Sequence, residues 1–95
     1  MYKLIFNSGA ERYFKKIKEK GLKDQFKEAL IKIRENPYIG QMKKGDLAGI
    51  YGYDVRYKGS NYEIAYTIIE EHDKKIIVLL AGTRENFYEQ LKRYK

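Results

Sequence analysis

At the start of the chain, apolar residues occupy one side of an extended segment and part of the other side, and their period then changes. Tyr2, Leu4 and Phe6 share one side of an extended segment, which predicts a short strand within residues 1–7. After residue 7 the apolar side chains recur every three or four positions, as they do on a helix with one buried face. Two such runs follow each other, so we expect a helical hairpin directly after the first strand.

Local signals predict where these two helices begin and end. Ser8 and Glu11 have the spacing of a capping box at the start of the first helix, and Gly21 is expected to end it. The second helix is expected to end at Asn36, because the proline that follows disfavours helical backbone at the residue before it. The predicted buried faces consist of Ala10, Tyr13, Phe14 and Ile17 in the first helix and Leu22, Phe26, Ala29, Leu30 and Ile33 in the second.

Two alternating runs in the second half of the chain predict a β-hairpin. Tyrosine, valine or isoleucine occupies every second position over 51–57 and again over 62–68, and Gly59-Ser60 between them suits a tight turn. A two-residue turn at that position would set Arg56 opposite Glu63 on the neighbouring strand. The expected pairing therefore joins a cation and a carboxylate across the hairpin.

The remaining segments complete one domain. Residues 76–81 are apolar on both faces, as expected of a central strand, and a third helix is expected from Asn86, with Glu89 completing a second capping box. Residues 38–49 are polar and punctuated by glycine, which predicts an exposed loop. The order β-α-α-β-β-β-α over residues 1–95 predicts a single α+β domain. The helical hairpin is expected on one face of a small antiparallel-rich sheet, with the third helix at its rim.

Composition limits the chemistry that this domain can perform. The chain has no cysteine, which excludes disulfides and thiolate catalysis and favours the reducing cytoplasm. Its single histidine, His72, argues against transition-metal catalysis, and no apolar run approaches the roughly 20 residues of a membrane span. Twenty Lys and Arg against thirteen Asp and Glu give a net charge of +7. This charge predicts a nucleic acid or an acidic protein as partner, unless it serves solubility alone.

Three segments of the sequence carry a resemblance to a known family. They are the end of the second helix with the following loop, NPYIGQMKKGDLAGIY, the hairpin YDVRYKGSNYEIAY and the C-terminal segment LLAGTRENFYEQLKRY. Together with the order of elements, they resemble the RelE/ParE toxin superfamily over nearly the whole chain. The resemblance implies a messenger-RNA endonuclease, acting on free or ribosome-bound RNA, which an antitoxin encoded beside it keeps silent.

Ribonucleases of this family use the 2'-hydroxyl of the RNA as nucleophile, so the resemblance implies neither a metal nor an organic cofactor. The protein must help to deprotonate this hydroxyl, stabilise the crowded phosphate and protonate the leaving 5'-oxygen. The resemblance assigns Arg84 in GTRENFY to the scissile phosphate and Arg56 in YDVRYKG to a further basic position of the site. The structural alternatives are a surface ion pair for Arg56 and a strand-end or capping role for Arg84.

Tyr88 is the third residue that the resemblance singles out. It resembles a tyrosine that stacks on an RNA base or transfers a proton. Helical spacing predicts that the buried face of the last helix consists of other residues, namely Phe87, Leu91 and Tyr94. Tyr88 lies roughly 100° away from that face, so it either faces the cleft or points aside.

Glu63 is the main departure from the family pattern. The matching position often carries an arginine that contacts phosphate, whereas a carboxylate repels phosphate. Glu63 is therefore either a general base or only the ion-pair partner of Arg56. We expect three lysines to attract RNA without reading its sequence, namely Lys43, Lys44 and Lys58. His72, in the polar turn before the last strand, is a weak candidate for catalysis.

Two other functions are compatible with the same fold. The ParE branch binds DNA gyrase without chemistry of its own, and basic charge does not distinguish that activity from RNA cleavage. A degenerate toxin would retain antitoxin binding only, and Glu63 is the residue that favours this alternative. The segment GTRENFY and the position of Arg56 favour the endoribonuclease. We expect the antitoxin to cover basic and apolar surfaces, with a helix in a groove and an acidic or extended segment near Arg84.

Overall fold

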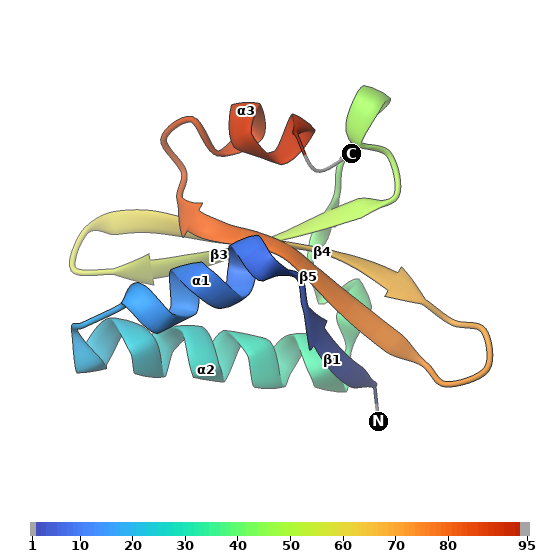
Figure 1. The fold of residues 1–95 in the computed structure, drawn as a ribbon, viewed down its shortest axis with the longest axis horizontal. Coiled ribbons are helices and arrows are strands. Elements are labelled where there is room, and N and C mark those ends of the chain that lie inside the picture. Colours follow the sequence, from blue (N-terminus) through green and yellow to red (C-terminus); the bar gives the residue numbers. More distant parts are fainter. Residues whose placement is uncertain (1, 94–95) are drawn as a thin grey trace.

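The structure, a computed structural model, describes residues 2–93 and contains one mixed β-sheet with helices on both faces (Figure 1). The strands lie in the order β1-β5-β4-β3-β2. β1 pairs with β5 in parallel, and the other neighbouring strands are antiparallel. The predicted α+β class is therefore confirmed. The strand bounds are β1 Lys3–Phe6, β2 Gln41–Met42, β3 Ile50–Tyr57, β4 Ser60–Ile69 and β5 Lys75–Thr83.

Two helices, α1 (Ser8–Lys16) and α2 (Lys20–Glu35), pack on one face of the sheet, and the short α3 (Phe87–Lys92) covers the opposite face (Figure 1). α3 therefore does not lie at the rim as expected. Its buried side chains pack in a small cluster with residues of β3, β4, β5 and the 3-10 helix Gly45–Leu47. The cluster consists of Leu47, Ile50, Ala65, Leu80, Phe87 and Leu91. A larger cluster fills the space between the helical hairpin and the sheet, and its most enclosed members include Ala10, Phe26, Ile33, Ile64, Tyr66 and Val78.

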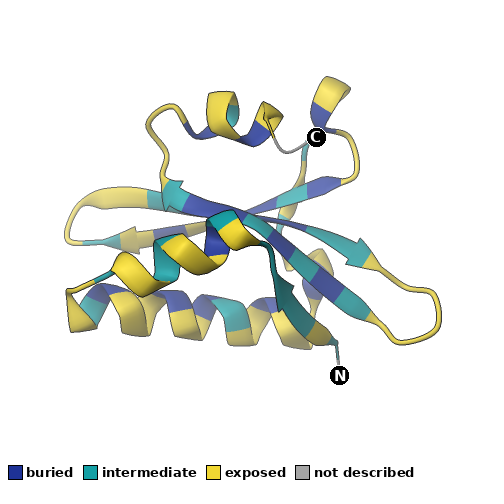
Figure 2. Ribbon diagram, in the orientation of Figure 1, coloured by how far each residue is buried: buried dark blue, intermediate teal, exposed yellow. Residues whose placement is uncertain are grey.

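The helical hairpin buries the face that the sequence predicts. In Figure 2 the buried residues of α2 recur along the side that faces the sheet, while the outer side is exposed. The buried residues of α2 are Leu22, Phe26, Ala29 and Ile33. The spacing of apolar residues was sufficient to orient this helix.

The ends of both helices differ from the prediction. Asn7, and not Ser8, caps α1, because its Oδ1 accepts a hydrogen bond from the Ala10 amide at 3.0 Å. Gly21 lies in the first turn of α2 and does not end α1, which stops earlier in the chain. A Cβ at position 21 would overlap the Tyr57 hydroxyl, so packing against β3 explains this glycine.

The β3–β4 hairpin has a different register from the predicted one. Its turn consists of Lys58 and Gly59, whose φ angles of 48° and 78° suit a type I′ turn. Glu63 lies opposite Asp54 and not opposite Arg56, so the predicted Arg56–Glu63 pairing is wrong. The shift of two residues leaves every side chain on its predicted face, and the apolar alternation could not distinguish the two registers.

The segment 38–49 is more ordered than the predicted exposed loop. Short 3-10 helices at Pro37–Ile39 and Gly45–Leu47 flank strand β2, and Leu47 is buried beneath α3.

The predicted capping box of α3 does not form within the described chain, because Asn86 makes no side-chain capping hydrogen bond. Tyr94, predicted for the buried face of α3, lies outside the described residues. No helix among residues 2–93 is long and apolar enough to cross a membrane.

Candidate functional site

Most of the predicted site residues lie at the end of β5, on the face of the sheet that α3 covers. Glu63 on β4 lies between Asp54 on β3 and Gly82 on β5. Arg84 follows β5, and its amide donates a hydrogen bond to the Asn61 carbonyl at 3.1 Å. This bond extends the pairing of the two strands and fixes the point at which Arg84 leaves the sheet.

Glu63 is a carboxylate enclosed within the fold, with 1% of its surface exposed. Its Oε2 lies 2.8 Å from Lys43 Nζ, and its Oε1 lies 3.5 Å from Arg84 Nε. Neither oxygen accepts a well-directed hydrogen bond from the described residues, so ion pairing compensates the buried charge. An unpaired carboxylate at such a site would cost several kcal/mol. Glu63 therefore holds both cations in place.

Gly52 on β3 makes room for this ion pair. It is buried, and a Cβ there would overlap Glu63 Oε2 and lie 2.8 Å from Lys43 Cε. Any larger residue would displace the pair. Sequence analysis missed Gly52, although a glycine inside an alternating strand often marks a close approach of another group.

Tyr88 on α3 contacts both cations of the site. Its Oη accepts a hydrogen bond from Lys43 Nζ at 2.7 Å, and this Nζ lies 4.6 Å from the centre of the ring. Burial would lower the pKa of Lys43, but the contacts with Glu63 and Tyr88 outweigh it and raise that pKa. The hydrogen bond with Tyr88, followed by the charges of Asp54 and Glu63, raises the pKa of Arg84. Tyr88 thus faces the site, which was one of the two predicted orientations.

Asp54 is a second carboxylate at this site. Its Oδ1 lies 3.7 Å from Arg84 Nη1. The side chain of Asp54 is 71% exposed and that of Arg84 is 45% exposed, so both open to solvent while Glu63 is enclosed. Sequence analysis missed Asp54, because its position beside Arg84 depends on the hairpin register.

Five residues form what we call the charged cluster, namely Lys43 after β2, Asp54 on β3, Glu63 on β4, Arg84 after β5 and Tyr88 on α3. The exposed guanidinium can bind an oxyanion, the phenol can give a proton and a carboxylate can accept one. Within residues 2–93 no group of three or more His, Cys, Asp or Glu side chains is placed to hold a metal ion.

The other residues that sequence analysis considered lie apart from the charged cluster. Arg56 is exposed on the same face, about 10 Å or two strands away from β5, and has no ion pair with a described residue. Lys58 in the hairpin turn pairs with Glu19, before α2, at 2.8 Å. Lys44 is exposed in the loop after β2, and His72 lies in the turn at the opposite end of β5.

The fold of the chain is similar to that of two bacterial toxins of known structure. The free toxin RelE of E. coli, in an arginine-to-alanine double mutant, matches with a TM-score of 0.75 and 22% identity over 98% of this chain and 92% of that chain. The same mutant in complex with a peptide of the antitoxin RelB matches with a TM-score of 0.69 and 25% identity, over 94% and 93% of the two chains. The toxin-antitoxin complex RelBE2 of Mycobacterium tuberculosis matches with a TM-score of 0.67 and 25% identity, over 87% and 98%.

A family comparison based on sequence agrees with this likeness. No curated protein matches the chain. The family model of the ParE-like toxin of type II bacterial toxin-antitoxin systems matches residues 4–92, which include all five residues of the charged cluster. The chain therefore belongs to the ParE-like toxin family of type II bacterial toxin-antitoxin systems.

Proposed function

We propose that this toxin is an endoribonuclease that cleaves messenger RNA, free or on the ribosome, by attack of the RNA's own 2'-hydroxyl. The observation that carries the proposal is the surrounding of Arg84, an exposed guanidinium beside the Tyr88 phenol and a solvent-facing carboxylate. Cleavage by this route needs a cation for the phosphate, a group that gives a proton and a group that accepts one. The charged cluster supplies all three types of group.

Arg84 is the residue that binds the scissile phosphate in this proposal. Glu63 faces its Nε, and the partly exposed guanidinium retains further N–H groups that can donate to phosphate oxygens. A preorganised donor at developing negative charge is worth about 10²-fold to 10³-fold in rate. Because Glu63 fixes the guanidinium before RNA arrives, little rearrangement is needed during the reaction.

Tyr88 is the general acid, and Lys43 acts through it. Two cations, Lys43 and Arg84, face the Tyr88 hydroxyl and stabilise the negative charge that its oxygen carries after the proton has left. The Lys43 side chain is only 15% exposed and is tied to Glu63, so it does not serve as the free RNA-binding lysine that the sequence predicts. Contacts with the RNA backbone fall to the exposed Lys44, Lys58 and Arg56.

The test uses the purified toxin with an end-labelled unstructured RNA and with ribosomes translating a defined messenger. We expect cleavage that leaves a 2',3'-cyclic phosphate. Arg84→Ala should lower its rate by about 10²-fold to 10³-fold. Its melting temperature should stay close to that of the wild type, because Lys43 still pairs with Glu63. Arg84→Lys should recover only part of the rate, since a point charge cannot replace the guanidinium.

Arg12→Ala is the matched control, because Arg12 is an exposed arginine on α1 outside the charged cluster. This variant should cleave like the wild type. If the wild type cleaves neither free nor ribosome-bound RNA, and Arg84→Ala inhibits growth as strongly as the wild type, the nuclease proposal is wrong.

A second candidate function is inhibition of DNA gyrase without chemistry. The observation that favours it is the charge balance of the cluster, because Glu63 and Asp54 offset Lys43 and Arg84 and weaken the attraction for phosphate. A supercoiling assay with gyrase separates the two functions. Gyrase inhibition that survives Arg84→Ala, in the absence of RNA cleavage, would favour this candidate.

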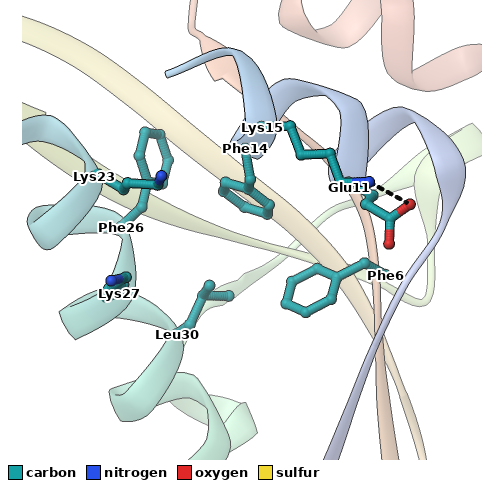
Figure 3. Close-up of a pocket in the computed structure, with 8 residues that line it drawn as sticks. All are labelled: Phe6, Glu11, Phe14, Lys15, Lys23, Phe26, Lys27 and Leu30. Atoms are coloured by element: carbon teal, nitrogen blue, oxygen red, sulfur yellow. Dashed lines mark ion pairs between the residues drawn. The ribbon is translucent and has the colours of Figure 1, made fainter. Parts of the chain in front are cut away.

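We further propose that a cognate antitoxin places a helix in the groove between α1 and α2 (Figure 3). The groove has a volume of about 320 Å³, and its apolar lining consists of Phe6, Phe14, Phe26 and Leu30. Lys15, Lys23 and Lys27 stand around it, and only Lys15 has an ion-pair partner among the described residues. An amphipathic helix with carboxylates beside its apolar face is complementary to this groove. RelBE2 and the RelE–RelB peptide are toxin-antitoxin complexes.

Charge reversal on α2 tests the position of the antitoxin. The double variant Lys23→Glu/Lys27→Glu should weaken antitoxin binding by about tenfold or more, because like charges would then face each other, while melting is nearly unchanged. Lys18→Glu/Lys32→Glu, at exposed positions outside the groove, is the matched control. Equal affinity of both double variants would show that the antitoxin helix binds elsewhere.

A further inference from the structure

Deprotonation of the 2'-hydroxyl needs a general base that RNA can reach, and the charged cluster contains two carboxylates that differ in accessibility. We propose that Asp54 is the general base of this toxin and that Glu63 is a positioning residue that does not contact the RNA. The inference rests on the proposed RNA cleavage and assigns one of its steps. Of the two roles that the sequence left open for Glu63, general base or ion-pair partner of Arg56, it sets aside that of general base.

Accessibility separates the two carboxylates. They lie directly opposite each other on β3 and β4, yet the Asp54 side chain is 71% exposed and that of Glu63 is 1% exposed. A general base must come within hydrogen-bond distance of the proton that it accepts. Asp54 meets this requirement at the surface of the cluster, whereas Glu63 is covered by Lys43 and by the backbone of Gly52.

Glu63 is also committed to its partners. Its two oxygens face Lys43 Nζ at 2.8 Å and Arg84 Nε at 3.5 Å. A proton on Glu63 would remove the counter-charge of the largely buried Lys43, and an uncompensated buried charge is costly. Asp54 has a single contact of this kind, at 3.7 Å from Arg84 Nη1, and both groups are solvated there. Asp54 can accept a proton without leaving a buried charge unpaired.

The positions of Asp54 and Tyr88 around Arg84 suit a concerted proton exchange. Asp54 approaches the guanidinium from β3, and Tyr88 contacts it from α3. The 2'-hydroxyl proton passes to Asp54 while the 2'-oxygen forms a bond to phosphorus. The bond between phosphorus and the 5'-oxygen breaks, and Tyr88 gives its proton to that oxygen. The products are a 2',3'-cyclic phosphate and a 5'-hydroxyl, after which Asp54 loses its proton to water and Tyr88 regains one.

The competing role for Asp54 is to orient Arg84. An ion pair at 3.7 Å between two solvated groups contributes little, and Glu63 already faces the Nε of the same guanidinium. A carboxylate beside the phosphate also opposes RNA binding. The role of general base explains why a negative charge at Asp54 is present beside the phosphate although it weakens RNA binding.

The experiment measures single-turnover cleavage of an end-labelled RNA, free and on ribosomes, from acidic to neutral pH. The variants are Asp54→Asn, Asp54→Glu and Glu63→Gln, with Asp73→Asn in the remote β4–β5 turn as the matched control. Affinity is measured in parallel with the same RNA carrying 2'-deoxyribose, which cannot be cleaved. Melting temperatures report on the fold of each variant.

Asp54→Asn should lower the cleavage rate by about 10²-fold to 10⁴-fold, the usual contribution of a general base, and should bind the deoxy-substituted RNA as tightly as the wild type or more tightly. The wild-type rate should rise with pH as the base loses its proton. This rise should vanish in Asp54→Asn and persist in the residual activity of Glu63→Gln. Asp54→Glu should recover part of the rate, and Asp73→Asn should match the wild type.

Cleavage by Asp54→Asn at the wild-type rate, or a rate that still rises with pH in that variant, would overturn the base assignment and leave the nuclease intact. A cleavage rate that no longer rises with pH in Glu63→Gln would show that Glu63 is the general base. A wild-type protein that cleaves neither RNA would overturn the nuclease proposal and this inference with it.

Discussion

Replacing Gly52 with alanine tests whether the ion pair of Lys43 and Glu63 organises the charged cluster. The added Cβ would overlap Glu63 Oε2 and lie 2.8 Å from Lys43 Cε and 2.9 Å from Lys43 Nζ, closer than non-bonded atoms allow. The backbone cannot move away easily, because Gly52 is paired with Gln41 on one side and Ala65 on the other. Relief must therefore come from the two charged side chains.

The magnitude follows from what those side chains lose. Extra atoms in a packed interior cost about 1–3 kcal/mol, and removal of one partner from a buried ion pair costs about 3–5 kcal/mol. Lys43 can swing toward solvent, and Arg84 stays 3.5 Å from Glu63, so we expect the lower range. For a domain of this size, a loss of about 1–3 kcal/mol lowers the melting temperature by roughly 5–20 °C.

Thermal unfolding followed by circular dichroism measures this loss. Gly82→Ala on β5 is the matched control, because its Cβ would meet Tyr13 Cε1 at 3.8 Å, an ordinary contact. In a Glu63→Ala background, Gly52→Ala should cost much less, since the nearest overlapping atom is gone and Lys43, no longer paired with Glu63, can move away from the new Cβ. Equal melting of the two glycine variants, or equal costs of Gly52→Ala in both backgrounds, would refute the close packing of Glu63 on Gly52.

Two further predictions concern the core. Phe26→Ala should lower the free energy of unfolding by about 3–5 kcal/mol, because Phe26 is 1% exposed. Lys27→Ala, at the exposed position beside it, should change the free energy of unfolding little. Equal losses in the two variants would contradict the orientation of α2. Burial raises the pKa of Tyr66 to about 12, and its hydroxyl donates a hydrogen bond to the Pro37 carbonyl at 2.7 Å. Because folding raises this pKa, the protonated phenol contributes stability that is fully present below pH 10 and is lost as pH rises toward 12. The free energy of unfolding measured with urea should therefore fall over this interval. Tyr66→Phe should be less stable than the wild type at neutral pH but should lose less unfolding free energy between pH 10 and 12. An equal loss in both proteins would show that Tyr66 is not its source.

Elements whose evidence lies within one segment could be predicted from the sequence. The buried face of α2 follows from apolar residues at helical spacing, and the central position of β5 follows from its apolar character on both faces. The cap of α1 could not be chosen in this way. Asn7 and Ser8 are both favourable capping residues, and only the backbone geometry shows that Asn7 accepts the hydrogen bond.

The site depends on contacts between segments, and there the sequence was insufficient. A hairpin shifted by two residues keeps its apolar face, so the pattern could not show that Asp54, and not Arg56, lies opposite Glu63. No local pattern in the loop around Lys43 indicates that strand β2, only two residues long, places the Lys43 side chain beside Glu63. The importance of Gly52 becomes visible only when the atoms opposite it are known.

The charges of this toxin are divided between the two faces of the sheet. In the charged cluster two carboxylates offset Lys43 and Arg84, so the cluster adds little to the net charge of +7. Residues 1–37 of the sequence hold ten basic and five acidic side chains, and their two helices, α1 and α2, pack on the opposite face from α3. In the proposed nuclease, long-range attraction of RNA therefore comes mainly from the helical hairpin, while bond breaking depends on the cluster. An acidic antitoxin helix between α1 and α2 would then slow the association of RNA without touching Arg84.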